Sequence, residues 1–301
     1  MNLLPGMQIF ERGWLSANNI LFVDEAGSTL VDTGYVTHAP QTLALLRHAL
    51  GERKLDRIIN THLHSDHCGG NAALSAHYGC RITIPQAEAN AVRDWNEDAL
   101  SYRATGQQCP RFAFDDILQG GDRLRLGGAQ WQALIAPGHD PHSLMLWCER
   151  EGLLISADAL WENGFGVIFP ELEGRAAFDD TRATLDLIAS LDARLVIPGH
   201  GAPFSDVRGA LDRACARLDY LAADPLRNAQ NGIKVLVKFR LLERRSASLA
   251  ELTKWMREVP LLASCNQGFL HMDDEALAQW VAQQLVKAGA ARLEDGFLLD
   301  C

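Results

Sequence analysis

The stretch THLHSDHCGG, residues 61–70, concentrates side chains that can bind metal ions. Of the ten histidines in the chain, three fall there together with one aspartate, as His62, His64, Asp66 and His67. A tight loop after a strand can direct His62 and His64 to one side and Asp66 and His67 to the other. Two imidazoles and one further ligand form a three-ligand cup around Zn²⁺ with one position left open. The stretch therefore predicts the beginnings of two metal sites, with a solvated histidine-rich turn as the alternative.

Three residues at the ends of apolar runs could complete both sites. His139 follows QWQALIAPG, Asp158 is the last residue of GLLISAD, and His200 is the last residue of ARLVIPGH. A lone histidine in a loop is most often an ordinary polar residue, so each of these residues alone is weak evidence for a metal site. Together they predict two ligand sets: His62, His64 and His139 in the first, Asp66, His67 and His200 in the second, and Asp158 bridging them with one carboxylate oxygen for each ion.

These motifs resemble those of the metallo-β-lactamase superfamily, in the branch that holds hydroxyacylglutathione hydrolases. The resemblance covers about residues 8–205, where Asp32 in VDTG is followed by THLHSDH, APGH, SAD and PGHG. It implies an α/β fold of the αββα sandwich type, with two sheets face to face, helices outside and metal ions at one sheet edge. It also implies that Asp32 has a structural role and holds the metal-binding loop.

The resemblance separates this chain from several relatives. β-Lactam-cleaving members carry cysteine or serine where this chain has Asp158, and flavin-linked diiron members carry glutamate in place of His64. Nucleases with a β-CASP insertion need an extra domain before the last histidine, and the segment here is too short. We therefore expect a hydrolase of a small ester or thioester, similar to hydroxyacylglutathione hydrolase. An RNA-cleaving phosphodiesterase is one alternative, and a single-iron persulfide dioxygenase, which uses fewer of these ligands, is another.

The implied chemistry requires two divalent metal ions. Zn²⁺ is our choice for these nitrogen and oxygen ligands, and iron or manganese stays open because histidine–carboxylate sets also suit them. A metal-bound hydroxide is available at neutral pH and would attack the substrate. Asp66 is the candidate catalytic residue that orients the nucleophile and takes its proton. Cys68, next to His67, is interpreted as a small buried residue that opens a helix and not as a nucleophile.

Three residues are candidate substrate contacts. Trp161 and Phe165 belong to WENGFGVIFPEL, residues 161–172, whose aromatic and glycine content suits one wall of a cleft. A packed loop without ligand contacts is the alternative. His142, three residues after His139, could contact the substrate, donate a hydrogen bond to a metal ligand, or cap a turn at the surface.

Short strands that alternate with helices must position these side chains. The runs NILFVDE and STLVDTG predict a strand pair, and HAPQTLALLRHALG predicts a helix that Gly51 ends. Further strands are expected at DRIIN, RITIP, QWQALIAP, GLLISAD and ARLVIPGH. The candidate ligands stand where strands end, which is where α/β-layered proteins tend to build sites. We assign residues 1–225 to this catalytic domain.

The pattern changes at about residue 226. Helices are expected at IKVLVKFRLLERR, at SASLAELTKWM with a capping box of Ser248 and Glu251, and at DDEALAQWVAQQLVKAGA. The closing ARLEDGFLLD is a hairpin signal. Three helices and a hairpin predict a winged-helix-like domain over residues 226–301, similar to the C-terminal domain of β-lactamase-like endoribonucleases. From Leu226 onward, ten Lys and Arg against nine Asp and Glu argue against a DNA-binding role and favour a lid over the cleft or a dimer contact.

Charge and cysteine content limit the partners. The net charge of −10 opposes attraction to nucleic acid or to an anionic membrane. No apolar run approaches the roughly 18 residues of a membrane span. The seven cysteines are scattered, odd in number and never spaced as CxxC, which suits reduced thiols in a cytoplasmic protein. We expect a small-molecule substrate and leave a homodimer open.

Overall fold

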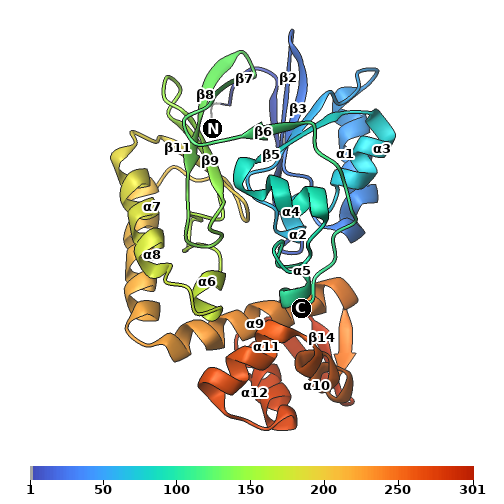
Figure 1. Ribbon diagram of the computed structural model, residues 1–301, viewed down its shortest axis with the longest axis vertical. Coiled ribbons are helices and arrows are strands. Elements are labelled where there is room, and N and C mark those ends of the chain that lie inside the picture. Colours follow the sequence, from blue (N-terminus) through green and yellow to red (C-terminus); the bar gives the residue numbers. More distant parts are fainter. Residues whose placement is uncertain (1–2) are drawn as a thin grey trace.

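A computed structural model describes residues 3–301, and its two large sheets face each other between layers of helices (Figure 1). The first sheet has the order β1-β2-β3-β4-β5-β6. Its strands are β1 (Met7–Phe10), β2 (Asn19–Asp24), β3 (Gly27–Val31), β4 (Arg57–Ile59), β5 (Arg81–Pro85) and β6 (Asp116–Leu118). The pairs from β1 to β3 are antiparallel and those from β3 to β6 are parallel.

The second sheet has the order β11-β10-β9-β8-β7. Its strands are β7 (Arg123–Leu126), β8 (Ala129–Ile135), β9 (Leu144–Cys148), β10 (Leu153–Ala157) and β11 (Leu195–Pro198). Only the β10–β11 pair is parallel. All the strands that the sequence predicts are present, and β1, β6, β7 and β9 are additional.

The space between the sheets is filled by apolar side chains from both. Phe22 and Ile59 from the first sheet pack in one cluster with Trp131, Leu146 and Ile155 from the second. The rings of Phe22 and Trp131 meet edge to face, with centroids 5.5 Å apart. Burying each such side chain contributes about 1.5–3 kcal/mol, so this layer fixes the two sheets and the strand ends that carry the site.

Helices cover the outer face of each sheet. The first sheet packs against α1 (Ala39–Leu50), α3 (Asn71–Tyr78) and α4 (Ala89–Asp94), and the second against α7 (Phe178–Ser190) and α8 (Val207–Ala222). Short helical turns connect the elements: η1 (Val36–His38), α2 (Ser65–Cys68), η2 (Gln86–Glu88), α5 (Tyr102–Thr105) and α6 (Phe169–Leu172). The αββα sandwich expected from the sequence is confirmed.

One helix begins later than the sequence predicts. Cys68 ends the short helix α2, and α3 starts at Asn71 instead of at Cys68. The two glycines between them lie against the backbone after β3. A β-carbon on Gly70 would come within 2.6 Å of the Thr33 carbonyl oxygen, and one on Gly69 within 2.6 Å of the Val36 nitrogen. The chain therefore breaks its helix where it must pass close to that loop.

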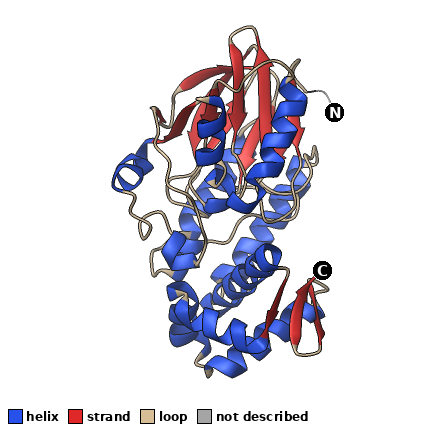
Figure 2. Ribbon diagram, turned by 90° about the vertical axis from the view of Figure 1, so that its right-hand side faces the viewer, coloured by secondary structure: helices blue, strands red, loops and turns tan. Residues whose placement is uncertain are grey.

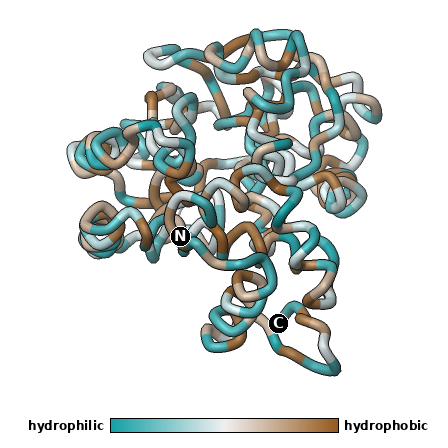
Figure 3. Tube along the Cα trace, turned by 60° about the horizontal axis from the view of Figure 1, so that its bottom comes forward, coloured by the Kyte–Doolittle hydropathy of each residue, from teal (hydrophilic) through white to brown (hydrophobic). Residues whose placement is uncertain are grey.

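The C-terminal helices lie below the sandwich, coloured orange to red in Figure 1. They are α9 (Pro225–Arg244), α10 (Leu249–Glu258), α11 (Pro260–Cys265), the π-helical turn η3 (Asn266–Leu270) and α12 (Asp274–Lys287). A separate small sheet joins β12 (Ser246–Ser248), β14 (Phe297–Asp300) and β13 (Ala291–Glu294) in the order β12-β14-β13. Figure 2 shows it in red below the C-terminus. Hydrophobic and hydrophilic bands alternate along these helices in Figure 3, as in helices that bury one face.

The expected elements of this region are confirmed, including the capping box of Ser248 and Glu251 and the terminal hairpin. Strand β12 and helix α11 were not expected. The apolar cluster here also takes in Val167 and Leu172 from the segment after Asp158, so the region packs against one side of the candidate site. The winged-helix assignment and the boundary at residues 225 and 226 remain predictions. No helix within residues 3–301 is long and apolar enough to cross a bilayer.

Candidate metal centre

The seven predicted ligands come together at one edge of the sandwich. They form two groups in which the nitrogen and oxygen atoms lie within 4.8 Å of one another: His62, His64 and His139 in the first, and Asp66, His67, Asp158 and His200 in the second. His62 follows β4, His139 follows β8, and Asp158 and His200 follow the neighbouring strands β10 and β11. Each of the two sheets thus supplies residues to both groups.

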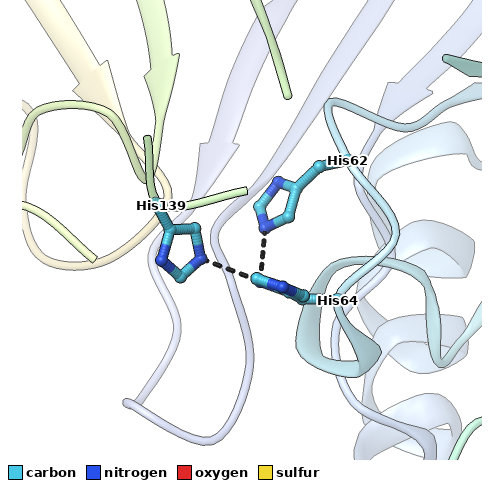
Figure 4. A group of neighbouring side chains, drawn as sticks. All are labelled: His62, His64 and His139. Carbon is cyan, nitrogen blue, oxygen red and sulfur yellow. Dashed lines mark hydrogen bonds between the residues drawn. The ribbon is translucent and has the colours of Figure 1, made fainter. Parts of the chain in front are cut away.

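In the first group, three imidazole nitrogens converge on one point (Figure 4). His64 Nδ1 lies 3.1 Å from His62 Nε2 and 2.8 Å from His139 Nε2. A single proton on His64 Nδ1 can satisfy only one of these neighbours. Three nitrogens at about 2.05 Å from one tetrahedral zinc ion would be separated by about 3.3 Å. A small cation therefore fits this group better than a hydrogen bond does.

Burial keeps the first group neutral. It lowers the pKa of His62 well below the usual value, lowers the pKa of His64, and lowers the pKa of His139 to about 4. The His139 Nδ1–H donates to the Val167 carbonyl oxygen at 2.5 Å, which leaves the Nε2 lone pair directed at the group. Neutral imidazoles with free lone pairs are the form that binds metal ions.

The second group buries two carboxylates together, and Asp32 adds a third beside His67. Asp66 and Asp158 are buried beside His67 and His200, and His200 Nε2 lies 3.1 Å from Asp66 Oδ2. Burial alone would lower the pKa of His67, but the carboxylates of Asp158 and Asp32 raise it well above the usual value. One buried nitrogen that faces this group, His67 Nε2, has no hydrogen-bond partner among residues 3–301. A buried nitrogen without a partner beside clustered carboxylates is what a divalent cation would satisfy.

Asp158 lies between the groups through one oxygen atom. Its Oδ2 is 3.4 Å from His139 Nε2 in the first group and 3.4 Å from His67 Nε2 in the second. Its Oδ1 points elsewhere and accepts a hydrogen bond of 3.1 Å from Trp161 Nε1. The structure therefore differs from the expectation of one carboxylate oxygen for each ion, because Trp161 occupies the other oxygen.

Local backbone geometry aims Asp158 into the site. The pairing of β10 with β11 shifts register between Ile155 and Ala157, and Ala157 has a left-handed φ of 47°. A β-carbon on Gly199 would lie 2.1 Å from Asp158 Oδ1, and one on Gly166 would lie 2.4 Å from His139 Nδ1. Bulges and strained residues of this kind cluster at functional sites, where they redirect a side chain.

Asp32, the residue directly after β3, ties the histidine-rich loop to that strand. Its Oδ1 accepts from the Thr61 backbone N–H at 2.9 Å, and its Oδ2 accepts from Thr61 Oγ1 and from His67 Nδ1, both at 2.8 Å. Asp32 itself has a left-handed φ of 56°. These contacts fix the start of the histidine-rich loop and turn His67 Nε2 toward Asp158, in line with the structural role that the resemblance implies.

A cavity of about 100 Å³ opens on both groups. Trp161 and Phe165 line it, as expected for one wall of a cleft, together with Phe169 and the C-terminal residues Leu236 and Phe239. His142 does not line it. The ring of His142 faces a neighbouring cavity of about 220 Å³, and its Nδ1 lies 2.8 Å from Glu88 Oε1, which raises the pKa of His142. His142 therefore lies beside the metal cavity and not on its wall, and its role as a substrate contact remains a prediction.

Trp14 and Arg217 are among the cavity residues that were not found from the sequence. Trp14 stacks on His200 with ring centroids 5.4 Å apart and planes 8° apart, and it meets Trp161 edge to face at 5.3 Å. Arg217, from α8, lines the same cavity. Trp14 lies in ERGWLS and Arg217 in an ordinary amphipathic helix, so neither belongs to a motif that could have marked it.

Cys68 is enclosed by protein and does not reach the cavity. Its Sγ lies 3.3 Å from the Leu63 carbonyl oxygen, 3.2 Å from the Tyr102 hydroxyl and 3.7 Å from Cys109 Sγ. Burial raises the pKa of the thiol well above its usual value. The interpretation of Cys68 as a buried residue that is not a nucleophile agrees with this environment.

The comparisons with known proteins agree on one family. The profile described as the Metallo-beta-lactamase superfamily matches residues 12–200. A hydroxyacylglutathione hydrolase of a Methylobacterium species is 28% identical over 57% of this chain and 59% of its own length. The Caenorhabditis elegans Beta-lactamase-like protein 2 homolog is 24% identical over 73% of this chain and 65% of its own length. The chain thus spans less than two thirds of the length of these relatives.

Solved structures share the fold. A metallo-beta-lactamase family protein from Thermus thermophilus is 20% identical with a TM-score of 0.60, and all of both chains is covered. A beta-lactamase domain protein from Burkholderia ambifaria is 19% identical with a TM-score of 0.61 and covers 100% of this chain and 94% of its own. TTHA1623, solved in a di-iron-bound form, is 24% identical with a TM-score of 0.55 over 69% of this chain and 98% of its own.

Proposed function

The chain belongs to the metallo-beta-lactamase superfamily, and we propose that it is a hydrolase that uses two divalent metal ions to cleave a small ester or thioester. The observation that carries this proposal is the pair of donor groups that share Asp158 Oδ2. Similarity to several hydroxyacylglutathione hydrolases supports the thioester as the bond that is cleaved.

The residues that would hold the ions are already arranged for it. His62 Nε2, His64 Nδ1 and His139 Nε2 would hold one ion, and Asp66, His67 Nε2 and His200 would hold the other, with Asp158 Oδ2 common to both. When bound, the ions supply positive charge that polarises the substrate carbonyl and lowers the pKa of water. Zn²⁺ suits this nitrogen-rich set, and iron or manganese suits the carboxylate-containing group as well.

Asp66 is the residue we propose as the proton acceptor. Burial would raise its pKa, but the hydrogen bond from His200 and the charges of His67 and His200 lower it, so the carboxyl group is ionised at neutral pH. Asp66 also lines the metal cavity. It can therefore orient an attacking water molecule through one oxygen and accept its proton, while the other oxygen would help to hold the ion.

The RNA-cleaving alternative receives no support from the C-terminal basic residues. An enzyme of that kind would use Lys234, Lys238, Arg240, Arg244 and Arg245 to follow phosphates. Lys238 and Arg245 instead pair with Asp300, and Arg240 and Arg244 pair with Glu243. Four of these five side chains are thus committed to carboxylates of the same region.

A substrate panel tests the proposal. Metal-loaded protein is assayed with an S-acylglutathione, an acyl-CoA, a lactone and bis-p-nitrophenyl phosphate, with Asp158→Ala as the matched inactive variant. We expect turnover of at least one thioester or ester and its loss in Asp158→Ala. Cleavage of the phosphodiester alone, lost in the same variant, would contradict the proposal and favour a phosphodiesterase.

A further inference from the structure

A groove of about 620 Å³ adjoins the metal cavity on the side of the C-terminal helices. Four residues line both spaces, namely Trp14, Trp161, Val235 and Phe239. The groove continues between α9 and α12, where Leu242 and Leu285 extend its apolar lining. Its volume lies within the range of about 300–1,000 Å³ that small-molecule sites have, whereas the metal cavity alone is far smaller.

The apolar lining of this groove is unusually exposed. Trp14 is 55% exposed and Val235 39% exposed. The indole of Trp14 is held in place by stacking on His200 and by its edge contact with Trp161. A fixed aromatic side chain beside a candidate metal ligand offers a flat surface on which part of a substrate can pack.

The charge of the groove is opposite to that of the chain. Three lysines and no acidic residue line it, although the chain has a net charge of −10. Lys238 is paired with Asp300, but Lys234 and Lys287 have no carboxylate within 4.0 Å in the described part of the chain. Lys234 is half-buried and Lys287 exposed. Two lysines without partners at an apolar groove are suited to bind an anion.

Arg217 extends this positive charge toward the metal centre. It lines the metal cavity, donates to Asn231 Oδ1 at 3.1 Å, and has a buried Nε with no hydrogen-bond partner. It has no carboxylate within 4.0 Å among residues 3–301. Its partner Asn231 lies three residues before Lys234 on α9, so the two cations are neighbours, and burial together with the charge of Arg217 lowers the pKa of Lys234.

The cavity on the other side of the metal centre has the opposite lining. It has about 220 Å³ and shares His64, His139 and Phe169 with the metal cavity. Four acidic residues line it, Glu88, Asp98, Asp140 and Glu173, against the basic residues His142 and Arg175. An anionic substrate arm is therefore favoured on the groove side and disfavoured on this side.

We propose that the groove binds the anionic carrier arm of an acyl thioester, with Lys234 and Lys287 contacting its phosphate or carboxylate groups. The apolar part of the carrier packs on Trp14, Phe239 and Leu242, and the thioester carbonyl reaches the metal cavity past Trp161. The larger space receives the carrier because the carrier is the longer part of such a substrate. This inference rests on the proposed thioester hydrolase and adds the class of substrate and the residues that select it.

Binding of the free carrier tests this inference separately from catalysis. Titration calorimetry with metal-loaded protein measures the Kd of coenzyme A, of glutathione and of uncharged pantetheine. The test variant is Lys234→Gln with Lys287→Gln, and the control is Lys254→Gln, which is exposed on α10 and outside the groove. We expect the double variant to weaken binding of the anionic carrier about tenfold, as two charge-assisted contacts allow. The control should leave the Kd unchanged.

The relative affinities of the three carriers show which anionic group the groove binds. Tighter binding of coenzyme A than of pantetheine indicates phosphate recognition, and tighter binding of glutathione than of coenzyme A indicates carboxylate recognition. An unchanged Kd in the double variant, or pantetheine bound as tightly as either anion, would overturn the inference even if thioesters are cleaved. Carrier binding that the double variant loses, in a protein that cleaves no ester or thioester, would leave the groove assignment standing and contradict the proposed function.

Discussion

The metal centre and the groove beside it hold their charged side chains under very different constraints. At the centre, each of Asp158, His67 and His139 is buried and held by a second residue: Trp161 on Asp158, Asp32 on His67 and the Val167 carbonyl on His139. In the groove, Lys234 and Lys287 lie on a helical surface without acidic partners among the described residues 3–301. A rigid, desolvated constellation supports chemistry, whereas partly solvated cations select a ligand by charge. Substitutions should therefore abolish activity at the centre and only shift affinity in the groove.

The largest effect is expected for Asp158→Ala. Its Oδ2 faces both donor groups and no other side chain can replace it, so we expect kcat/KM to fall at least about a thousandfold, a loss of about 4 kcal/mol of transition-state stabilisation. The fold should persist because the sandwich core consists of apolar strands. Asp186→Ala, at an exposed position on α7, is the control. Near-normal turnover by a folded, metal-replete Asp158→Ala protein would refute the shared role.

Asp32→Asn should have the next largest effect. Asparagine tolerates the left-handed backbone at this position, so the change removes the charge on the acceptor of His67 Nδ1 without adding strain. Losses of about 10–100-fold in metal affinity are typical when such a supporting carboxylate is changed. Competition with a chromogenic chelator measures this, with Asp186→Asn as the control. Equal affinity in the two variants would show that Asp32 supports the fold only.

Trp14→Ala probes the boundary between the two regions, because Trp14 contacts His200 and lines the groove. Loss of one aromatic packing surface is worth about 1 kcal/mol, so KM for a thioester should rise about fivefold. We expect kcat to change less, since His200 keeps its contact with Asp66. Steady-state kinetics separates the two parameters, and a fall in kcat larger than the rise in KM would place Trp14 with the metal centre instead.

The smallest effect concerns salt. Hydrolysis of a neutral ester should vary by less than about twofold between low and moderate ionic strength, because the buried centre is poorly screened. The KM for an anionic thioester should rise over the same range, since exposed lysines are screened by salt. Equal salt dependence for both substrates would show that the groove does not distinguish them by charge.

The clustering of the candidate ligands could be predicted from the sequence because they stand at the ends of apolar runs. DRIIN, GLLISAD and ARLVIPGH each predict a strand, and the side chains at or just after their ends, His62, Asp158 and His200, are carried to one edge of the sandwich. The single shared oxygen of Asp158 could not be foreseen, since it depends on where Trp161 donates its hydrogen bond. The sequence left the place of His142 open, because spacing alone does not reveal that its ring contacts Glu88 in the neighbouring cavity.

The groove shows the limit of the same reasoning. Its residues come from the loop at Trp14, the segment after Asp158, and helices α9 and α12. None has a distinctive spacing, and the lysines of α9 look like the solvated side of an amphipathic helix. A tertiary contact distinguishes Lys234 from Lys238, because Asp300 at the end of β14 pairs with Lys238 and not with Lys234. Only the folded chain shows which cation is free.

The number of metal ions per chain tests the central claim most directly. Elemental analysis of fully loaded, dialysed protein, with concentration from amino-acid analysis, should give two divalent ions per chain because both donor groups are complete. Separate measurement of zinc, iron and manganese identifies the metals. A stoichiometry of one or less in protein loaded with excess metal would contradict the two-ion centre formed by His62, His64, His139, Asp66, His67, His200 and the shared Asp158.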